Sequence, residues 1–183
     1  MMKRPAKTAI GAAIAAAVAV ALPIALPLTD ASEGLRLKAY QDPARIWTIC
    51  NGRTTDVKPG DTATREQCRI WLHSELAEHM TAAAQATPRL VENPQALAAA
   101  GDFHYNAGPG WWGKSPMAAH FAGGRWAEGC KAFIGYIVLA QVPKPIAGAR
   151  CTRNAKGKLY CELPGLVTRR QREARMCQTG RWQ

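Results

Sequence analysis

The N-terminal part of the chain holds its longest apolar run. Residues 8–28 contain no charged side chain; three basic residues precede them, and Asp30 and Glu33 follow. As a helix this segment would be about 31 Å long, which matches the hydrocarbon core of a bilayer. The pattern therefore predicts a helix that can cross a membrane.

This predicted helix is only weakly hydrophobic. Nine of its 21 residues are Ala, and Gly11, Pro23 and Pro27 interrupt it. Eight large aliphatic side chains supply only about −2 to −5 kcal/mol of insertion free energy. They are Ile10, Ile14, Val18, Val20, Leu22, Ile24, Leu26 and Leu28. We expect the segment to hold in a membrane only weakly.

After residue 28 the pattern changes to shorter elements. Residues from about 37 to 57 predict short strands and turns. Thr64 with Gln67 forms a capping box that begins a helix with apolar side chains at helical spacing. Further helices are expected from Asn93-Pro94 to near Asn106, from Ser115-Pro116 to before Gly123, and over residues 125–139 and 165–178.

These elements predict two segments. Residues 1–28 form the basic start and the apolar helix, and residues 29–183 form one α+β domain, mostly helical with a small β-sheet. We expect its core to include Trp71, Trp126, Phe133 and Tyr136.

The net charge of +11 is concentrated near the C-terminus, because residues 144–183 carry ten basic side chains against Glu162 and Glu173. Such a tail favours a polyanionic partner. No nucleic-acid recognition motif accompanies it, so we expect no nucleic-acid partner and favour the cell envelope. A merely solvated basic helix is the alternative.

Six cysteines indicate an oxidising compartment. Fifteen pairings are possible, so the sequence does not fix the disulfides. Order along the chain favours Cys50 with Cys68 and Cys151 with Cys161, which leaves Cys130 with Cys177. No Cys-x-x-Cys motif occurs and the four His residues show no ligand spacing with the cysteines, so neither a metal nor another cofactor is expected.

The candidate chemistry lies in the run EGLRLKAYQDPARIWT, where Glu33, Asp42 and Thr48 are separated by eight and five residues. Hydrolysis of a sugar polymer needs one carboxyl group that donates a proton and a second group that handles water. A hydroxyl group can hold that water. Each residue also has a structural interpretation: Glu33 in a capping box begun by Asp30, Asp42 in a turn with Pro43, and Thr48 in a strand. Gly34 argues against the capping box, because it favours a helix end.

This run resembles glycoside hydrolase family 24, the phage-type lysozymes. Residues 103–110 (FHYNAGPG) and 163–177 (LPGLVTRRQREARMC) are similar to two further segments of that family, whereas Arg53 replaces a usual His. The resemblance implies a lysozyme-like fold with the small sheet near the active site. It also implies hydrolysis of the β-1,4 bond between N-acetylmuramic acid and N-acetylglucosamine in peptidoglycan.

By that resemblance Glu33 is the general acid, kept protonated by burial, while Asp42 and Thr48 position water. Substrate contacts are expected from Asn106, Trp111, Trp112 and Arg170; the two Trp residues follow a Gly-Pro-Gly turn and are alternatively membrane contacts. The enzyme alternative is a lytic transglycosylase, which needs no external water. A non-catalytic protein that binds peptidoglycan or membrane is the other alternative.

The apolar segment resembles the signal-anchor-release (SAR) segment of some phage endolysins. This implies an enzyme tethered through residues 8–28 to the periplasmic face of the host inner membrane, then released into the periplasm. We expect it to be a monomer. Alternatives are a signal peptide cleaved near Ala19-Val20-Ala21 and a permanent anchor. No Cys lies in residues 8–28, which argues against release controlled by an anchor thiol.

Overall fold

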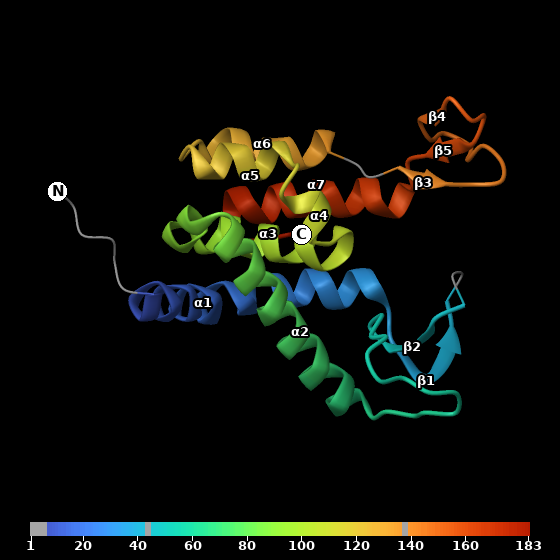
Figure 1. Cartoon of the computed structure of the whole chain (residues 1–183), viewed down its shortest axis with the longest axis horizontal. Helices are drawn as coiled ribbons and strands as arrows, with labels where there is room; N and C mark the ends of the chain where they lie inside the picture. Colours follow the sequence, from blue (N-terminus) through green and yellow to red (C-terminus); the bar gives the residue numbers. More distant parts are fainter. Residues whose placement is uncertain (1–6, 43–44, 137–138) are drawn as a thin grey trace.

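The computed structural model describes residues 7–42, 45–136 and 139–183. Its helices are α1 (Lys7–Glu33), α2 (Arg65–Ala86), η1 (Pro88–Glu92), α3 (Pro94–Ala107), α4 (Pro109–Trp112), α5 (Pro116–Ala122), α6 (Trp126–Gly135) and α7 (Pro164–Thr179). Its strands are β1 (Arg36–Gln41), β2 (Trp47–Cys50), β3 (Ala140–Gln141), β4 (Cys151–Arg153) and β5 (Leu159–Cys161). The fold is mostly helical with small sheets, as predicted (Figure 1).

Helix α1 runs without a break from the apolar segment to Glu33. The predicted boundary between residues 28 and 29 therefore falls inside a helix and coincides with no end of an element. Of the described residues, 9–33 form one helix long and apolar enough to cross a membrane.

One face of α1 belongs to the main core. Residues spaced three or four apart are buried against the rest of the molecule, chiefly α3 and α2, as expected for one stripe of a helix. They are Ile14, Ala17, Val18, Ala21, Leu22, Ala25 and Leu28. The opposite face carries the exposed side chains of Pro23 and Pro27. Because a proline has no N–H, the carbonyl groups of Ala19 and Pro23 lose their helical partners.

Helix α3 lies at the centre of the molecule, where it contacts α1, α2 and α7 (Figure 1). Its residues 96–104 are all buried. A Cβ atom on Gly101 would come within 2.3 Å of Met80 Cγ, so this glycine permits the close approach of α2. The helix begins as predicted, because the Asn93 side chain accepts a hydrogen bond from the Ala96 N–H.

The other predicted helix starts are also confirmed. Thr64 and Gln67 exchange both hydrogen bonds of a capping box, and Ser115 accepts a hydrogen bond from the Ala118 N–H. Helix α6 ends at Gly135, four residues before the predicted end; residues 137–138 of that prediction lie outside the described residues.

Two antiparallel sheets flank the helices. The short strands predicted between about residues 37 and 57 are present as β1 and β2, which form an antiparallel hairpin with Tyr40 opposite Thr48. A second sheet of order β3-β5-β4 was not predicted. Its strands are only two or three residues long, too short to produce a readable alternation.

All six cysteines lie within the described residues and are paired as the chain order suggested. The disulfides are Cys50–Cys68, Cys130–Cys177 and Cys151–Cys161. The prediction of the core aromatic residues is also confirmed. Phe133 is buried, Trp126 and Tyr136 are partly buried against the main core, and Trp71 packs on a smaller cluster around Ile49.

Candidate active site

Glu33 is the last residue of α1, and Gly34 turns the chain toward β1 with a φ of 69°. The capping-box interpretation of Glu33 is therefore wrong, because the residue ends a helix rather than begins one. Its side chain is 21% exposed and forms an ion pair with Arg169. The expected burial is therefore only partial, and a guanidinium group contacts the carboxyl group directly.

Arg169 is held in turn by Asp102. The two side chains form a bidentate pair, with Nε and Nη2 of Arg169 each 2.9 Å from a carboxylate oxygen of Asp102. Burial alone would raise the pKa of Asp102, but the charge and hydrogen bonds of Arg169, assisted by Glu173 and Thr29, lower it overall. Asp102 therefore anchors the guanidinium that contacts Glu33.

A second buried pair lies beside the first. Arg170 is 2.7 Å from Glu173 and donates a hydrogen bond of 2.8 Å to Oδ1 of Asn106. Burial raises the pKa of Glu173 well above its usual range, although Arg170 opposes this. The raised pKa of Glu173 favours its protonated form, so Asp102 supplies the fully buried counter-charge of Arg169.

The predicted substrate contact by Arg170 is wrong in this structure. The residue is only 2% exposed, and its guanidinium lies 4.3 Å from the centre of the Phe103 ring. Arg170 lies beneath the surface and holds the side chain of Asn106 through a hydrogen bond.

Two hollows meet at Glu33, and Asn106 also lines both. One has a volume of about 320 Å³ and is lined further by residues of the β2–α2 loop, α2 and α3: Asn51, Gly52, Arg53, Thr54, Thr55, Glu75, Glu78, His79 and Tyr105. The other has about 550 Å³ and is lined further by Ala31, Ser32, Leu163, Gly165, Leu166, Thr168, Arg169 and Arg172. Glu33 thus lies where two halves of a cleft join.

Asp42 and Thr48 lie on the β1–β2 hairpin. Asp42 Oδ1 accepts a hydrogen bond of 2.8 Å from the Ile46 N–H; among the described residues its other carboxylate oxygen has no hydrogen-bond partner. Thr48 is 3% exposed and donates to the Ile46 carbonyl at 3.0 Å. Among the residues that the structure describes, neither of them lines a hollow at Glu33. Their joint action with Glu33 stays a prediction.

The two tryptophans that follow the Gly-Pro-Gly turn differ sharply. Trp112 is fully buried, donates from Nε1 to Thr87 at 3.2 Å and stacks on Phe121. Its predicted contact with sugar or membrane is therefore wrong, because the one-turn helix α4 points this ring into the core. Trp111 is 47% exposed but lines neither hollow at Glu33, and its role stays a prediction.

Arg53 occupies the position of the usual His and joins the hairpin loop to α2. It forms an ion pair with Glu75 and lies 5.0 Å from the centre of the Trp71 ring. Asn51 makes a related link, donating to Asp30 and to the Gly34 carbonyl, while its own carbonyl accepts from Tyr105. These bonds fix the loop beside Glu33.

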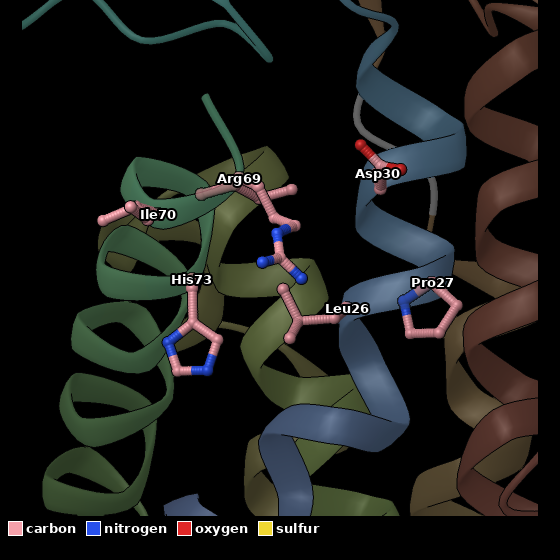
Figure 2. Close-up of a pocket in the computed structure, with 7 residues that line it drawn as sticks. Leu26, Pro27, Asp30, Arg69, Ile70 and His73 are labelled. Carbon is pink, nitrogen blue, oxygen red and sulfur yellow. The ribbon is translucent and has the colours of Figure 1, made fainter. Parts of the chain in front are cut away.

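A further groove, of about 540 Å³, lies between α1 and α2 (Figure 2). In the close-up Leu26 points from α1 toward Arg69 and His73 of α2. Neither Glu33 nor Asn106 lines this groove, so we do not assign the groove to the active site. Within the described ranges, no three His, Cys, Asp or Glu side chains are arranged to hold a metal ion.

Sequence reasoning missed Arg169 and Asp102. Their partners lie far apart in the chain: Arg169 is 136 positions from Glu33 and 67 positions from Asp102. The usable signal was Asp102 itself, a single acid in an apolar, Ala-rich helix. A buried acid of this kind requires a partner.

The phage lysozyme family model matches residues 30–173. A SAR-endolysin of Pseudomonas phage phiKMV is 38% identical over 104 residues, which cover 56% of this chain and 62% of that protein. A SAR-endolysin of Bacteriophage PS119 is 37% identical over 84 residues, covering 44% of this chain and 48% of that protein. The chain therefore spans about half to three-fifths of the length of these relatives.

Solved structures share the fold. The muramidase domain of SpmX from Asticaccaulis excentricus has a TM-score of 0.68 at 23% identity, covering 85% of this chain and 95% of that one. The active form of the P1 phage endolysin Lyz has a TM-score of 0.65 at 20% identity, covering 91% and 94%. The lysozyme-like fold expected from the sequence is thereby confirmed.

Proposed function

Because this chain belongs to the phage lysozyme family, we propose that it is an endolysin that hydrolyses the β-1,4 bond between N-acetylmuramic acid and N-acetylglucosamine in peptidoglycan. The observation that carries the proposal is the position of Glu33 where two hollows meet. A glycan strand lying along both hollows would present its backbone to this carboxyl group. Asn106, which lines both hollows, would contact the sugar beside it.

In the proposed mechanism Glu33 donates a proton to the leaving oxygen of the glycosidic bond. Arg169 orients this carboxyl group and is itself held by Asp102. The second carboxylate oxygen of Asp42 and the hydroxyl of Thr48 would hold and activate the attacking water. Since the Thr48 hydroxyl already donates to Ile46, it would act toward water as an acceptor.

Glu33→Gln tests the central assignment. It keeps the size of the side chain and a hydrogen-bond acceptor for Arg169 but has no acidic proton to transfer to the leaving oxygen. We expect the melting temperature to change by only a few degrees, while reducing-end release from purified peptidoglycan falls by roughly a factor of 10² to 10⁴. A variant that keeps most of its activity would refute the role of Glu33.

The products distinguish hydrolysis from the alternative chemistry. An anhydro-muramic end would indicate a lytic transglycosylase, and a plain reducing end would indicate hydrolysis. Asp42→Asn should abolish hydrolysis but be nearly tolerated in a transglycosylase. Mass spectrometry of the fragments separates the two.

We also propose that α1 first tethers the enzyme to the host inner membrane and then releases it into the periplasm. Two related proteins bear the name SAR-endolysin, and the apolar helix here is long enough to span a bilayer. Cleavage near Ala21 would remove Ile14 and Val18, whose side chains cover part of the core. Retention of the whole helix is therefore favoured over a cleaved signal peptide.

Intact-mass measurement of the soluble, active protein tests this part. We expect a product that retains Met1 or Met2. A product that begins near Leu22 would contradict release, and it would leave the lysozyme assignment untouched.

A further inference from the structure

The second sheet and its connecting loops, residues 139–161, form a strongly basic surface that the proposed mechanism does not use. This stretch contains five basic residues and no acidic one, and all five are exposed. They are Lys144, Arg150, Arg153, Lys156 and Lys158. Arg150 pairs with Glu162; among the described residues the three lysines have no ion-pair partner. We call residues 139–161 the basic sheet.

The basic sheet is held in one conformation by its own bonds. The disulfide Cys151–Cys161 closes the β4–β5 hairpin. At its turn, Asn154 Oδ1 accepts hydrogen bonds of 3.0 Å from the N–H groups of both Lys156 and Lys158. The backbone positions of the two lysines are therefore fixed before any partner arrives, which lowers the entropy lost on binding.

The basic sheet lies directly before a segment of the chain that lines the cleft. Strand β5 ends at Cys161, and Leu163 already lines the hollow that contains Glu33. In Figure 1 the basic sheet and the β1–β2 hairpin lie on opposite sides of the C-terminal end of α1. The hairpin also exposes basic side chains, Arg36, Lys38 and Arg45. A polymer that crosses Glu33 would pass two basic margins.

The positive charge of these two margins is suited to binding carboxylate groups. Membrane-binding surfaces combine cations with apolar side chains that enter the lipid, and no described residue of the basic sheet is an exposed large hydrophobic. A glycan of N-acetylated sugars offers few charges itself, whereas its peptide branches carry free carboxylates. The surface therefore fits an anion linked to the glycan better than it fits a bilayer.

We propose that the basic sheet binds the carboxylates of the acidic peptides attached to the glycan strand, and so makes the enzyme prefer peptide-bearing peptidoglycan. This inference rests on the proposed function and adds a second contact to the same substrate. Exposed ion pairs are individually weak and screened by salt. The effect should thus appear in KM at low ionic strength.

The test compares two double variants that each remove two exposed lysines. Lys156→Gln with Lys158→Gln changes the basic sheet, and Lys114→Gln with Lys131→Gln is the control elsewhere on the surface. Reducing-end release is measured on intact peptidoglycan and on strands whose peptides an amidase has removed. Melting curves of both variants exclude misfolding.

We expect the first variant to raise KM about three- to tenfold on intact peptidoglycan at low salt. This rise in KM should vanish on peptide-free strands. It should also vanish in 0.3 M salt, where the Debye length is roughly 6 Å and exposed charges are screened. The control should behave like the wild type on both substrates. An equal loss on both substrates, or no loss on either, would overturn the inference.

A membrane role is tested separately. If the same variant kept its KM on intact peptidoglycan but lost binding to vesicles of anionic phospholipid, the basic sheet would face the membrane and the inference would be wrong. Wild-type protein that released no reducing ends from either substrate would instead refute the proposed function.

Discussion

At the scale of single residues, the buried cluster behind Glu33 contains one carboxyl group, that of Glu173, whose pKa burial raises well above its usual range. Three carboxyl groups, from Glu33, Asp102 and Glu173, contact two guanidinium groups. Removing one partner of a buried ion pair leaves the other charge uncompensated. The cluster should therefore tolerate a neutral isostere of Glu173 but not the loss of Arg169, the partner of Asp102.

Arg169→Gln should lower the free energy of unfolding by about 3–5 kcal/mol, because it leaves the buried carboxylate of Asp102 without its partner. Glu173→Gln, which mimics the neutral acid, should change it by no more than about 1 kcal/mol. Denaturant unfolding of both variants measures the difference. Equal losses would show that Glu173 is ionised.

His104 makes stability depend on pH. Burial, and then the charge of His79, lower the pKa of His104 to about 4; the ordinary value is about 6.5. The folded state thus binds fewer protons than the unfolded state between these values, so stability should fall as the pH drops from about 6.5 to 4.

Glu173, with its raised pKa, contributes in the opposite direction, so the variant His104→Gln is compared with the wild type to isolate the histidine. The melting temperature of the variant should fall less steeply over this pH window. Parallel curves for the two proteins would contradict the assignment.

At the scale of elements, α1 has two faces that can be altered independently. Ala12, Ala13 and Ala16 lie on the exposed face, whereas Ala17 is buried in the core. Substitutions on the exposed face should change the affinity of the helix for lipid without disturbing its packing.

Changing Ala12, Ala13 and Ala16 to Leu adds roughly −1 to −2 kcal/mol of insertion free energy, enough to shift the equilibrium toward the membrane about tenfold. We expect later lysis and more protein in the membrane fraction after the membrane potential is dissipated. The purified soluble variant should keep normal activity. Unchanged fractionation and lysis time would contradict the proposed release.

Sequence reasoning succeeded for α2, α3 and α5 because their start signals are local. Thr64, Asn93 and Ser115 each bond to a backbone N–H three residues away. The prediction from sequence failed where a side chain contacts residues that are far away along the chain. Nothing near Trp112 in the sequence reveals that its ring meets Thr87 and Phe121, and nothing near Arg169 reveals Glu33.

At the scale of the whole molecule, the disulfides connect parts of the fold over different chain lengths. Cys130–Cys177 joins α6 to α7 across 47 residues, whereas Cys151–Cys161 spans ten residues within the basic sheet. The loop closed by the first is longer, and it constrains the unfolded chain more strongly.

Replacing Cys130 and Cys177 by Ser should lower the free energy of unfolding by about 4 kcal/mol, and replacing Cys151 and Cys161 by about 3 kcal/mol or less. Denaturant unfolding measures both losses. Thiol titration of the unreduced, denatured wild type should find no free cysteine. Two or more free thiols would contradict the disulfide pattern.

The unbroken course of α1 constrains how the gene can change. One residue inserted between Ile14 and Glu33 would turn one part of the helix by about 100° and shift it by about 1.5 Å relative to the other. Either the buried stripe or the Glu33 carboxyl group would then face the wrong way. A lipid anchor alone would accept such an insertion, since length is its main requirement. Over evolution, the stretch from Ile14 to Glu33 should therefore exchange aliphatic residues freely on its exposed face while neither gaining nor losing any residue.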